Sequence, residues 1–369
     1  MQPKGIMVIS PQTEKLLTDA GPWTLSLPNC GKPNPFPPEL NPEDAGRLRK
    51  EIQSFYLKSP AVFHALFLNE NVIESLPIDS TLLAEAGLVR EVGDGYKATI
   101  RLFPHRGRFF ATDFISIRQA DRVFPCDEDG SGFLADHLNI QYGDVVLDLG
   151  TGCGILATFC AEKAKRVVAT DVNPKALAYA DFNIRLNGVA DKVELLEGDL
   201  FGPIAGREFD VIVSNPPPVP VPAGTPFYTH SNGGPDGMAV FERILKEIWS
   251  FTSGAPRFRS VMMSMLRSED PIIVDRLRFH FKHANIKTTL TPIYPSRVEV
   301  DPMFTSLFSS VPSFPEWHTF IRNQGIVWLD CFFIDVEPHS EFEIQVNPYA
   351  DGPTVPDWQK RFAKFVLPS

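Results

Sequence analysis

The sequence has no apolar run long enough to cross a membrane. A membrane helix needs about 20 consecutive apolar residues, and no stretch of the 369-residue chain approaches that length. The first residues, MQPKGIMVISPQTEK, return to polar side chains too early for the apolar core of a secretory signal. We therefore expect a cytoplasmic protein without a membrane partner.

Metal-binding and disulfide patterns are also missing. The cysteines form no C-x-x-C pair and have no histidine at a zinc-ligand spacing; they lie at Cys30, Cys126, Cys153, Cys160 and Cys331. An odd, scattered set is typical of reduced, buried thiols in a cytosolic protein. The sequence therefore predicts no metal site.

An excess of positive charge is absent as well. Lysine and arginine number 35 against 45 acidic residues, which gives a net charge of −10. Proteins that bind nucleic acid usually need a basic face, because neutralised phosphates supply most of the affinity. One stretch, Arg101–Phe110, interleaves cations with aromatics, and we expect its aromatics to dock on a neighbouring domain. We expect nucleic acid not to be the substrate and favour a small molecule or a protein side chain.

The chain reads as three regions. Residues 1–42 are rich in proline and predict an extended lead-in. Residues 43–118 combine helical spacing with a hairpin signal at Gly93-Asp94-Gly95, which predicts a small α+β domain resembling a winged helix. Residues 119–369 alternate strands with helices, and the clearest strands are Val145–Leu149, Arg166–Asp171, Val193–Leu196 and Asp210–Ser214. This alternation predicts an α/β fold, a Rossmann-like parallel sheet with helices on both faces.

A glycine-rich turn follows the first of these strands. Gly150, Gly152 and Gly154 let the backbone turn tightly and approach a ligand closely. Asp171 ends the second strand and Asp199 follows the third, so both acids fall at the carboxyl edge of the sheet, where ligands bind. The glycines lack the G-x-G-x-x-G spacing that favours a nicotinamide dinucleotide.

Four segments together resemble the ordered motifs of class I S-adenosylmethionine (SAM)-dependent methyltransferases. They are D-L-G-T-G-C-G-I-L-A at 148–157, T-D-V-N-P-K-A-L at 170–177, G-D-L-F at 198–201 and S-N-P-P-P at 214–218. The resemblance covers about residues 121–265. It is nearest to the subgroup with an N-P-P-aromatic signature, which includes the release-factor glutamine methyltransferases and several RNA-base N-methyltransferases. The stretches V-F-P-C-D-E-D at 123–129 and G-G-P-D-G-M at 233–238 also resemble segments of that subgroup.

The resemblance implies a set of cofactor-binding residues for SAM. The methionine part would lie against Asp148 and the glycine-rich turn, while Asp171 would hold the ribose and Asp199 would face the adenine. The complete set implied for the cofactor is Asp148, Gly150, Thr151, Gly152, Gly154, Asp171, Val172, Asp199, Leu200 and Asn215.

The resemblance also implies that Asn215, Pro216, Pro217 and Pro218 form the catalytic loop. In the resembling enzymes the asparagine oxygen and the next backbone carbonyl accept hydrogen bonds from the substrate NH₂, and prolines keep these acceptors oriented. Pro218 departs from the pattern, because the subgroup has an aromatic ring there that stacks on a planar acceptor. We therefore expect a small-metabolite amine as the acceptor, with Tyr228 or Phe227 as a replacement ring.

Several functions remain open at this point. The leading hypothesis is a SAM-dependent N-methyltransferase that acts on an amine or amide nitrogen of a small metabolite. Alternatives are an RNA or protein-glutamine N-methyltransferase, and a SAM-consuming cyclase that forms azetidine-2-carboxylate and releases methylthioadenosine. A non-enzymatic regulator that only senses SAM is a third. The sequence does not indicate the oligomeric state.

Overall fold

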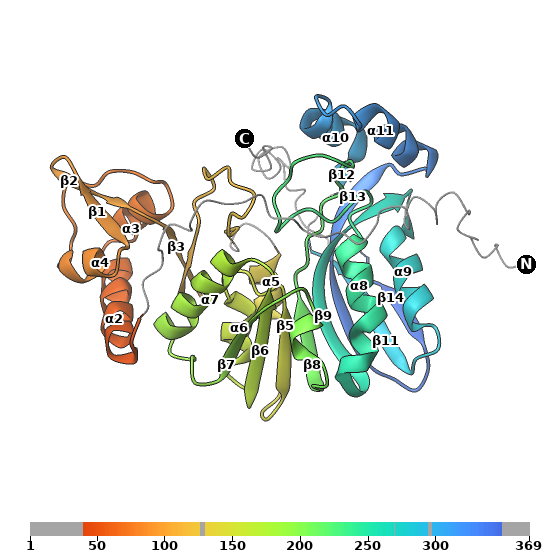
Figure 1. Ribbon diagram of the computed structural model, residues 1–369, viewed down its shortest axis with the longest axis horizontal. Helices are drawn as coiled ribbons and strands as arrows, with labels where there is room; N and C mark the ends of the chain where they lie inside the picture. The colour runs from red at the N-terminus through yellow and green to blue at the C-terminus, as the bar shows by residue number, and fades with distance from the viewer. Residues whose placement is uncertain (1–39, 126–129, 269, 294–296, 349–369) are drawn as a thin grey trace, which may run out of the picture. The chain divides into compact units, whose positions relative to one another are not determined.

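The computed structural model describes residues 40–125, 130–268, 270–293 and 297–348 (Figure 1). All of the described residues belong to one compact unit, Asn34–Ser369, and residues 1–39 lie outside the described ranges. Most of the proline-rich lead-in, Cys30, Cys126 and the acidic stretch at 127–129 also lie outside them. The division between residues 43–118 and 119–369 stays a prediction.

Ten described strands form one sheet, which confirms the expected α/β fold. Its main path runs β7-β6-β5-β8-β9-β13-β11-β14, with β10 and β12 paired to β9 and β13. The strands from β7 to β9 are parallel, whereas β13 is antiparallel to both β9 and β11. The bounds are β5 Val145–Leu149, β6 Arg166–Asp171, β7 Val193–Glu197, β8 Phe209–Ser214, β9 Thr252–Arg267, β10 Asp270–Pro271, β11 Ile286–Pro292, β12 Val298–Glu299, β13 Trp328–Pro338 and β14 Glu343–Val346.

Helices cover both faces of this sheet. Successive residues of a strand point to opposite faces, and apolar residues of these strands are buried on both. Val146 packs in one core with α6 and α7, while its neighbour Leu147 packs in a second core with α8 and α9. The helices of this part are α5 Ser131–Asp136, α6 Ile155–Cys160, α7 Pro174–Leu186, α8 Ala239–Glu247, α9 Ile272–Phe281, α10 Val300–Phe308 and α11 Phe314–Asn323, with short 3₁₀ turns at Gly202–Ile204 and Ile248–Phe251. None of the described helices is both long and apolar enough to cross a membrane.

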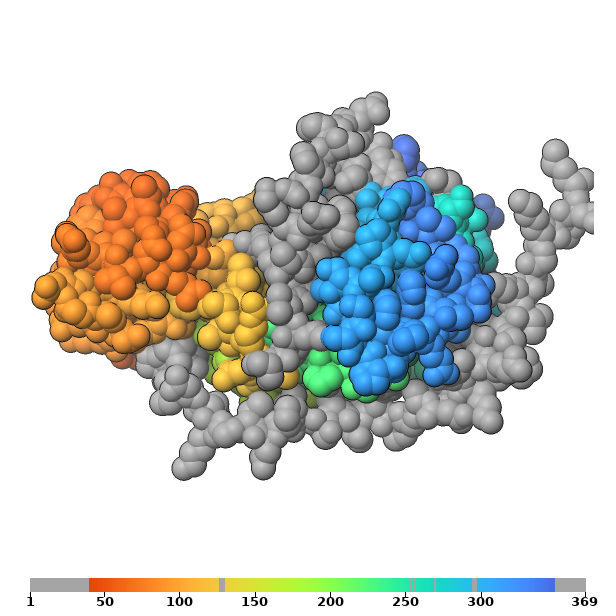
Figure 2. Space-filling view, turned by 90° about the horizontal axis from the view of Figure 1, so that it is seen from above, coloured from red at the N-terminus to blue at the C-terminus, as the bar shows by residue number. Residues whose placement is uncertain are grey.

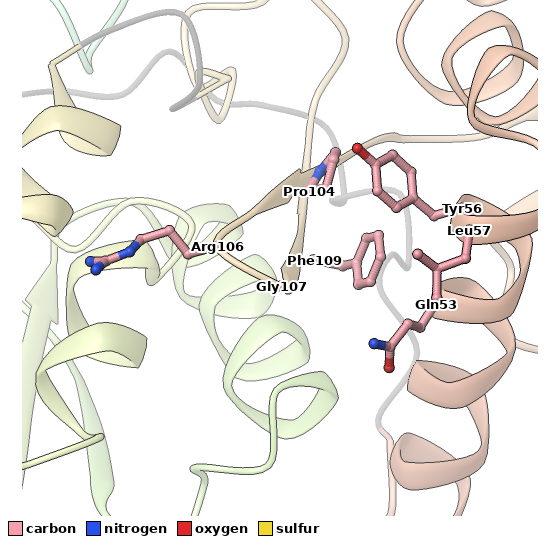
Figure 3. A pocket seen from close by; sticks show the side chains of 7 residues that line it. All are labelled: Gln53, Tyr56, Leu57, Pro104, Arg106, Gly107 and Phe109. Carbon is pink, nitrogen blue, oxygen red and sulfur yellow. The ribbon is translucent and has the colours of Figure 1, made fainter.

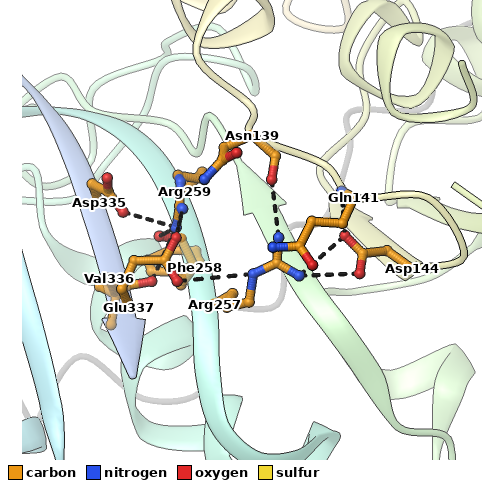
Figure 4. A network of polar contacts seen from close by, with 9 residues as sticks. All are labelled: Asn139, Gln141, Asp144, Arg257, Phe258, Arg259, Asp335, Val336 and Glu337. Atoms are coloured by element: carbon orange, nitrogen blue, oxygen red, sulfur yellow. Dashed lines mark hydrogen bonds and ion pairs between the residues drawn. The ribbon is translucent and has the colours of Figure 1, made fainter. Parts of the chain in front are cut away.

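The long strand β9 is fixed by two arginines (Figure 4). Arg257 bonds Asp144 just before β5, with Nη1 3.0 Å from Oδ1. Arg259 is buried and pairs with Asp335 and Glu337 on β13. These contacts tie the antiparallel extension of the sheet to its parallel half.

The N-terminal part consists of short helices and two hairpins. The helices are α2 Pro42–Lys58, α3 Pro60–Phe67 and α4 Thr81–Glu85, and the hairpins pair β1 Val89–Val92 with β2 Gly95–Ala98 and β3 Arg101–His105 with β4 Arg108–Thr112. Helices followed by hairpins match the expected α+β composition, while the winged-helix arrangement stays a prediction. Tyr56 of α2, Pro104 and Phe109 line a cavity of about 230 Å³. Figure 3 shows Tyr56 turned toward Pro104 and Phe109, and its ring contacts that of Phe109 with 5.8 Å between centroids. The side chain of Arg106 points away from these residues.

Asn183 of α7 and Asn187, which caps the C-terminus of that helix, hold the β3–β4 hairpin. Asn183 Oδ1 accepts from Ala111 N at 2.7 Å, and its Nδ2 donates to the carbonyls of Ala111 and of Cys153 in the glycine-rich turn. Asn187 pairs in the same way with both backbone groups of Phe109. Two asparagines four residues apart thus bind two residues of β4 that are two positions apart. Because Asn183 also binds the Cys153 carbonyl, this side chain links the hairpin to the glycine-rich turn.

Replacing Asn183 by aspartate tests this link. The variant Asn183→Asp places a carboxylate at a fully buried position and removes both donated bonds. We expect the free energy of unfolding to fall by about 2–4 kcal/mol, because two buried carbonyls lose their donor beside a buried charge. Urea denaturation measures the change. The exposed Asn71→Asp is the matched control and should shift stability by less than about 0.5 kcal/mol; equal effects of the two variants would contradict the account.

Candidate functional site

The predicted site residues converge at the carboxyl ends of the parallel strands. Asp148 lies near the end of β5, Asp171 ends β6, Asp199 follows β7, and Asn215 follows β8 directly. Because these strands are parallel and adjacent, their ends meet at one edge of the sheet. Residues up to 67 positions apart in sequence are thus brought together.

The glycine-rich turn leaves open space along that edge. Gly150, Gly152 and Gly154 all have positive φ, at 70°, 57° and 82°, which other residues adopt only with strain. A Cβ on Gly150 or Gly152 would meet no atom within 4 Å, so both face unfilled space. A Cβ on Gly154 would come within 3.1 Å of Ala180 on α7, so this glycine serves close packing instead.

Asp148 binds the glycine-rich turn and the start of α6 through its carboxylate. Its side chain is 0% exposed, and Oδ2 accepts from Thr151 Oγ1 at 2.7 Å and from Ala157 N at 3.0 Å. Burial raises the pKa of Asp148 to about 7, although both hydrogen bonds oppose this rise. Its Oδ1 is buried and has no hydrogen-bond partner among the described residues.

Asp171 braces the other side of the turn. Its Oδ2 accepts from Gly152 N at 2.8 Å, and its Oδ1 accepts from Asn173 N at 2.9 Å. Asn173 Nδ2 in turn donates to the carbonyl of Asp121 at 2.8 Å. Burial raises the pKa of Asp171, and the backbone donors partly offset the rise. The neighbouring Val172 is half-buried beside it.

Asp199 lies further out than the other two acids. It is half exposed and pairs with Arg243 of α8 at 2.8 Å. Leu200 has a positive φ of 47°, and its carbonyl accepts from Thr170 Oγ1 at 3.3 Å. The predicted contact of Asp199 with adenine stays a prediction.

The Asn215–Pro218 segment is held on both sides. Asn215 Nδ2 donates to Ser131 Oγ at 2.8 Å. This bond fixes the orientation of the side-chain amide and therefore the direction of its oxygen, Oδ1. A Cβ on Gly233 would come within 2.7 Å of the Pro217 carbonyl, and one on Gly237 within 2.7 Å of the Pro218 carbonyl. The glycines of G-G-P-D-G-M therefore allow this segment to pack closely against the three prolines.

A helical insertion supports the chain after Pro218, and the sequence did not predict it. In Figure 2, α10 and α11 form the blue surface on one side of the molecule. Trp317 Nε1 donates to the Pro235 carbonyl at 2.7 Å, and Ser313 Oγ donates to the Ala223 carbonyl at 2.8 Å. The amphipathic spacing of these helices was readable, but their contact partner was not, because it depends on tertiary structure.

The aromatic residues expected to replace the missing ring are both buried. Phe227 packs near Phe308 of α10, with 5.9 Å between ring centroids. Tyr228 is 0% exposed, and the guanidinium carbon of Arg122 lies 3.9 Å from its ring centroid. Arg122 is a residue of this region that the sequence analysis missed. The catalytic role of Tyr228 stays a prediction.

The cleft fits a cofactor with a polar, partly cationic tail. The open directions at Gly150 and Gly152 leave room for a chain laid across the turn, and Asp148 Oδ1 is a buried acceptor that still lacks a donor. No group of three or more potential metal ligands occurs within the described ranges.

The raised pKa of Asp148 gives a pH dependence of stability in the absence of cofactor. Since the folded-state pKa is about 7 and that of an unfolded aspartate is about 3.9, the folded protein binds the extra proton between these values. The free energy of unfolding should therefore fall as pH rises, by about 1.4 kcal/mol per unit near pH 5 and by about half that per unit near pH 7.

Asp148→Asn keeps an oxygen for both hydrogen bonds and cannot ionise, so the variant should lack this contribution. Denaturation of both proteins at pH 5, 6 and 7 measures the difference. Parallel stability curves for the two proteins would show that Asp148 does not titrate in this window.

Comparison with known proteins identifies the fold family. The family model described as the methyltransferase small domain matches residues 115–221. A putative protein N5-glutamine methyltransferase of Methanocaldococcus jannaschii is 33% identical over 139 residues, covering 36% of this chain and 68% of that protein.

Two further relatives match over shorter parts of their length. The release factor glutamine methyltransferase of Moorella thermoacetica is 39% identical over 110 residues, covering 27% of this chain and 39% of the relative. The ribosomal RNA small subunit methyltransferase C of Actinobacillus succinogenes is 37% identical over 109 residues, with 28% and 32% covered.

The prediction of a small-molecule substrate is contradicted by these relatives, whose names specify macromolecular substrates: proteins, a release factor and ribosomal RNA. The error arose from giving the missing ring at Pro218 too much weight. One side chain changes one wall of a pocket, whereas the matched motifs extend over the whole sheet edge.

Two observations agree on one family: the sheet with its glycine-rich turn, and the matches to known methyltransferases. The chain belongs to the class I SAM-dependent methyltransferases, and SAM is its cofactor.

Proposed function

We propose that this methyltransferase transfers the methyl group of SAM to the side-chain amide nitrogen of a glutamine in a protein. The observation that carries the proposal is the position of Asn215, which directly follows β8 beside the glycine-rich turn and has its amide oriented by Ser131. The names of the relatives support glutamine as the acceptor.

The proposed chemistry requires orientation more than acid–base catalysis. When bound, SAM would supply an electrophilic methyl group: its sulfur–methyl bond breaks as the carbon–nitrogen bond forms, S-adenosylhomocysteine leaves, and the amide nitrogen gives up one proton to solvent. Asn215 Oδ1 and the Pro216 carbonyl accept hydrogen bonds from the substrate NH₂, which orients the nitrogen toward the methyl group and favours charge build-up on it. Pro216 and Pro217 lack N–H groups, so they offer the substrate acceptors without competing donors.

The cofactor residues take matching roles in this proposal. Gly150, Thr151, Gly152 and Gly154 lie along the methionine part, and Asp148 keeps that turn in shape. Asp171, with Val172, holds the ribose hydroxyls, and Asp199, with Leu200, faces the adenine. Asp171 already holds Gly152 N, so one side chain would set both the turn and the ribose.

Charge favours a protein over RNA as the substrate. The β3–β4 hairpin carries three arginines. Arg106 and Arg108 pair with Asp136 and Glu162 at 3.3 and 2.8 Å, and Arg101 is buried. Cations neutralised by carboxylates of the same chain release few counterions from a phosphate backbone. The net charge of −10 acts in the same direction.

Replacing Asn215 by alanine should abolish turnover and spare the cofactor. We expect kcat to fall by about 10²-fold or more, because a misoriented acceptor nitrogen reacts slowly, while the Kd for SAM stays within about threefold of wild type, since the main cofactor contacts lie on other strands. Transfer of label from methyl-labelled SAM into the separated protein and RNA of a cell extract measures the activity.

Acid hydrolysis should release the label from protein as methylamine, as expected for N5-methylglutamine. The exposed Asn71→Ala is the control and should behave as wild type. Label found in RNA would overturn the proposed substrate, and near-normal turnover of Asn215→Ala would remove this residue from catalysis.

Asp171→Ala should weaken SAM binding by about 1–3 kcal/mol, because two backbone donors and the ribose hydroxyls lose their acceptor. Isothermal titration calorimetry gives the affinity, and the exposed Asp191→Ala is the matched control. An unchanged Kd in a folded Asp171→Ala protein would refute the ribose assignment.

A further inference from the structure

Arg122 is a buried cation that has no ion-pair partner among the described acids. It is 1% exposed. Burial lowers its pKa, and Asp113 acts on it only as a nearby charge that opposes this shift. A guanidinium nevertheless keeps its proton in proteins. Burying such a charge is costly unless other groups stabilise it, so the contacts that surround Arg122 are informative.

Two kinds of contact stabilise this charge. Nη1 donates to the carbonyls of Ile115 and Ile117 at 2.9 and 3.0 Å, within the segment 113–124 that carries Arg122. The guanidinium plane contacts aromatic rings, with its carbon 3.9 Å from the centroid of Tyr228 and 5.3 Å from that of Phe124. A desolvated cation–π contact is worth about 2 kcal/mol or more.

His230 completes the cluster as a neutral ring. It stacks on Tyr228 with 5.3 Å between centroids, and its Nε2 lies 3.5 Å from Arg122 Nη2. Because arginine can only donate, Nε2 presents its lone pair, and Nδ1 carries the proton toward Ser231 Oγ at 2.6 Å. Burial and Arg122 lower the pKa of His230 well below its usual value, so the ring adds no second charge.

Tyr228 and His230 belong to the loop 219–233, which follows directly after the Asn215–Pro218 segment. We call residues 219–233 the acceptor loop, because they continue from the segment proposed to bind the methyl acceptor. Its two ends are joined: Val219 N donates to the Ser231 carbonyl, and Gly233 N donates to the Val219 carbonyl. Its ring cluster lies under Arg122, and Thr229 N donates to the Ala120 carbonyl at 2.9 Å. The middle of the acceptor loop is thus held by the segment 113–124.

The segment 113–124 is itself tied to the cofactor side. Asp113 accepts from Val123 N and from Tyr179 of α7, and it pairs with Lys175 at 2.6 Å. Asn173, the residue that donates to Asp171, also donates to the Asp121 carbonyl. Arg122 therefore connects the elements that contain Asp171 with the acceptor loop that follows Pro218.

We propose that Arg122 is a positioning residue for methyl transfer: its guanidinium clamps the acceptor loop through the ring of Tyr228 and so holds Asn215–Pro218 in place against the cofactor cleft. A role of this contact in methyl transfer rests on the proposed function. The ring face of Tyr228 is what the clamp uses, and its hydroxyl, which is buried without a partner among the described residues, takes no part.

The first test needs no substrate. Arg122→Met keeps the length of the side chain but removes its charge and plane, and Arg118→Met is the matched control in the same segment. With S-adenosylhomocysteine present, limited chymotrypsin digestion should cleave at Phe227 or Tyr228 about tenfold faster in Arg122→Met, because opening of the loop governs cleavage of buried sites. Arg118→Met should match wild type. Unchanged cleavage in a folded Arg122→Met protein would overturn the clamp, whatever the methyl acceptor is.

The second test separates positioning from folding and from hydroxyl chemistry. Tyr228→Phe keeps the ring and should retain full kcat, whereas Tyr228→Leu should lower kcat by about 10–100-fold. Arg122→Met should resemble Tyr228→Leu, with SAM binding at one site per chain and with Kd and KM within about threefold of wild type. Equal losses in Tyr228→Phe and Tyr228→Leu would place the hydroxyl in the chemistry and refute the proposal. If Arg122→Met fails to fold, the tyrosine pair alone decides.

Discussion

The site depends on two carboxylates that hold one glycine-rich turn. Asp148 binds Thr151 and the first turn of α6, while Asp171 binds Gly152 from the next strand. Three residues of the turn adopt positive φ, and the two carboxylates add to the backbone bonds that Gly150 N and Thr151 N donate to the Thr170 carbonyl. Burial raises the pKa of each acid, and the charge of Asp171 adds to the rise at Asp148. This cost is the kind that functional sites carry, and a bound cofactor with a cationic end would relieve it.

Further contacts extend from this turn to the rest of the molecule. Asn183 joins Cys153 of the turn to the β3–β4 hairpin, and Asn173 joins Asp171 to the segment that carries Arg122. On the other side, α10 and α11 hold the chain after Pro218 through Trp317 and Ser313. The acceptor segment is therefore fixed from two directions, which suits a reaction whose rate depends on orientation more than on a strong base.

Much of the sheet and of the cofactor edge was predictable from sequence. Short apolar strands alternate with helices, and the acids fall at strand ends, so local pattern and position carry the information. Arg122 was not predictable, since an isolated arginine in a segment without regular structure carries no periodic signal and its aromatic partner Tyr228 lies in a distant loop. The insertion of α10 and α11 was missed because its contacts with the chain after Pro218, through Trp317 and Ser313, depend on tertiary structure. The prediction of a small-molecule substrate was wrong because it rested on one residue, Pro218. The structure of the loop that surrounds Pro218 could not be known from the sequence.

A crystal structure with S-adenosylhomocysteine tests the central claim most directly, which is that cofactor and acceptor meet at Asn215. The account predicts the homocysteine part along Gly150–Gly154, the ribose hydroxyls on Asp171, and the sulfur facing Asn215 and Pro216. A cofactor whose sulfur points away from Asn215, or one bound outside the carboxyl edge of β5 and β6, would contradict it.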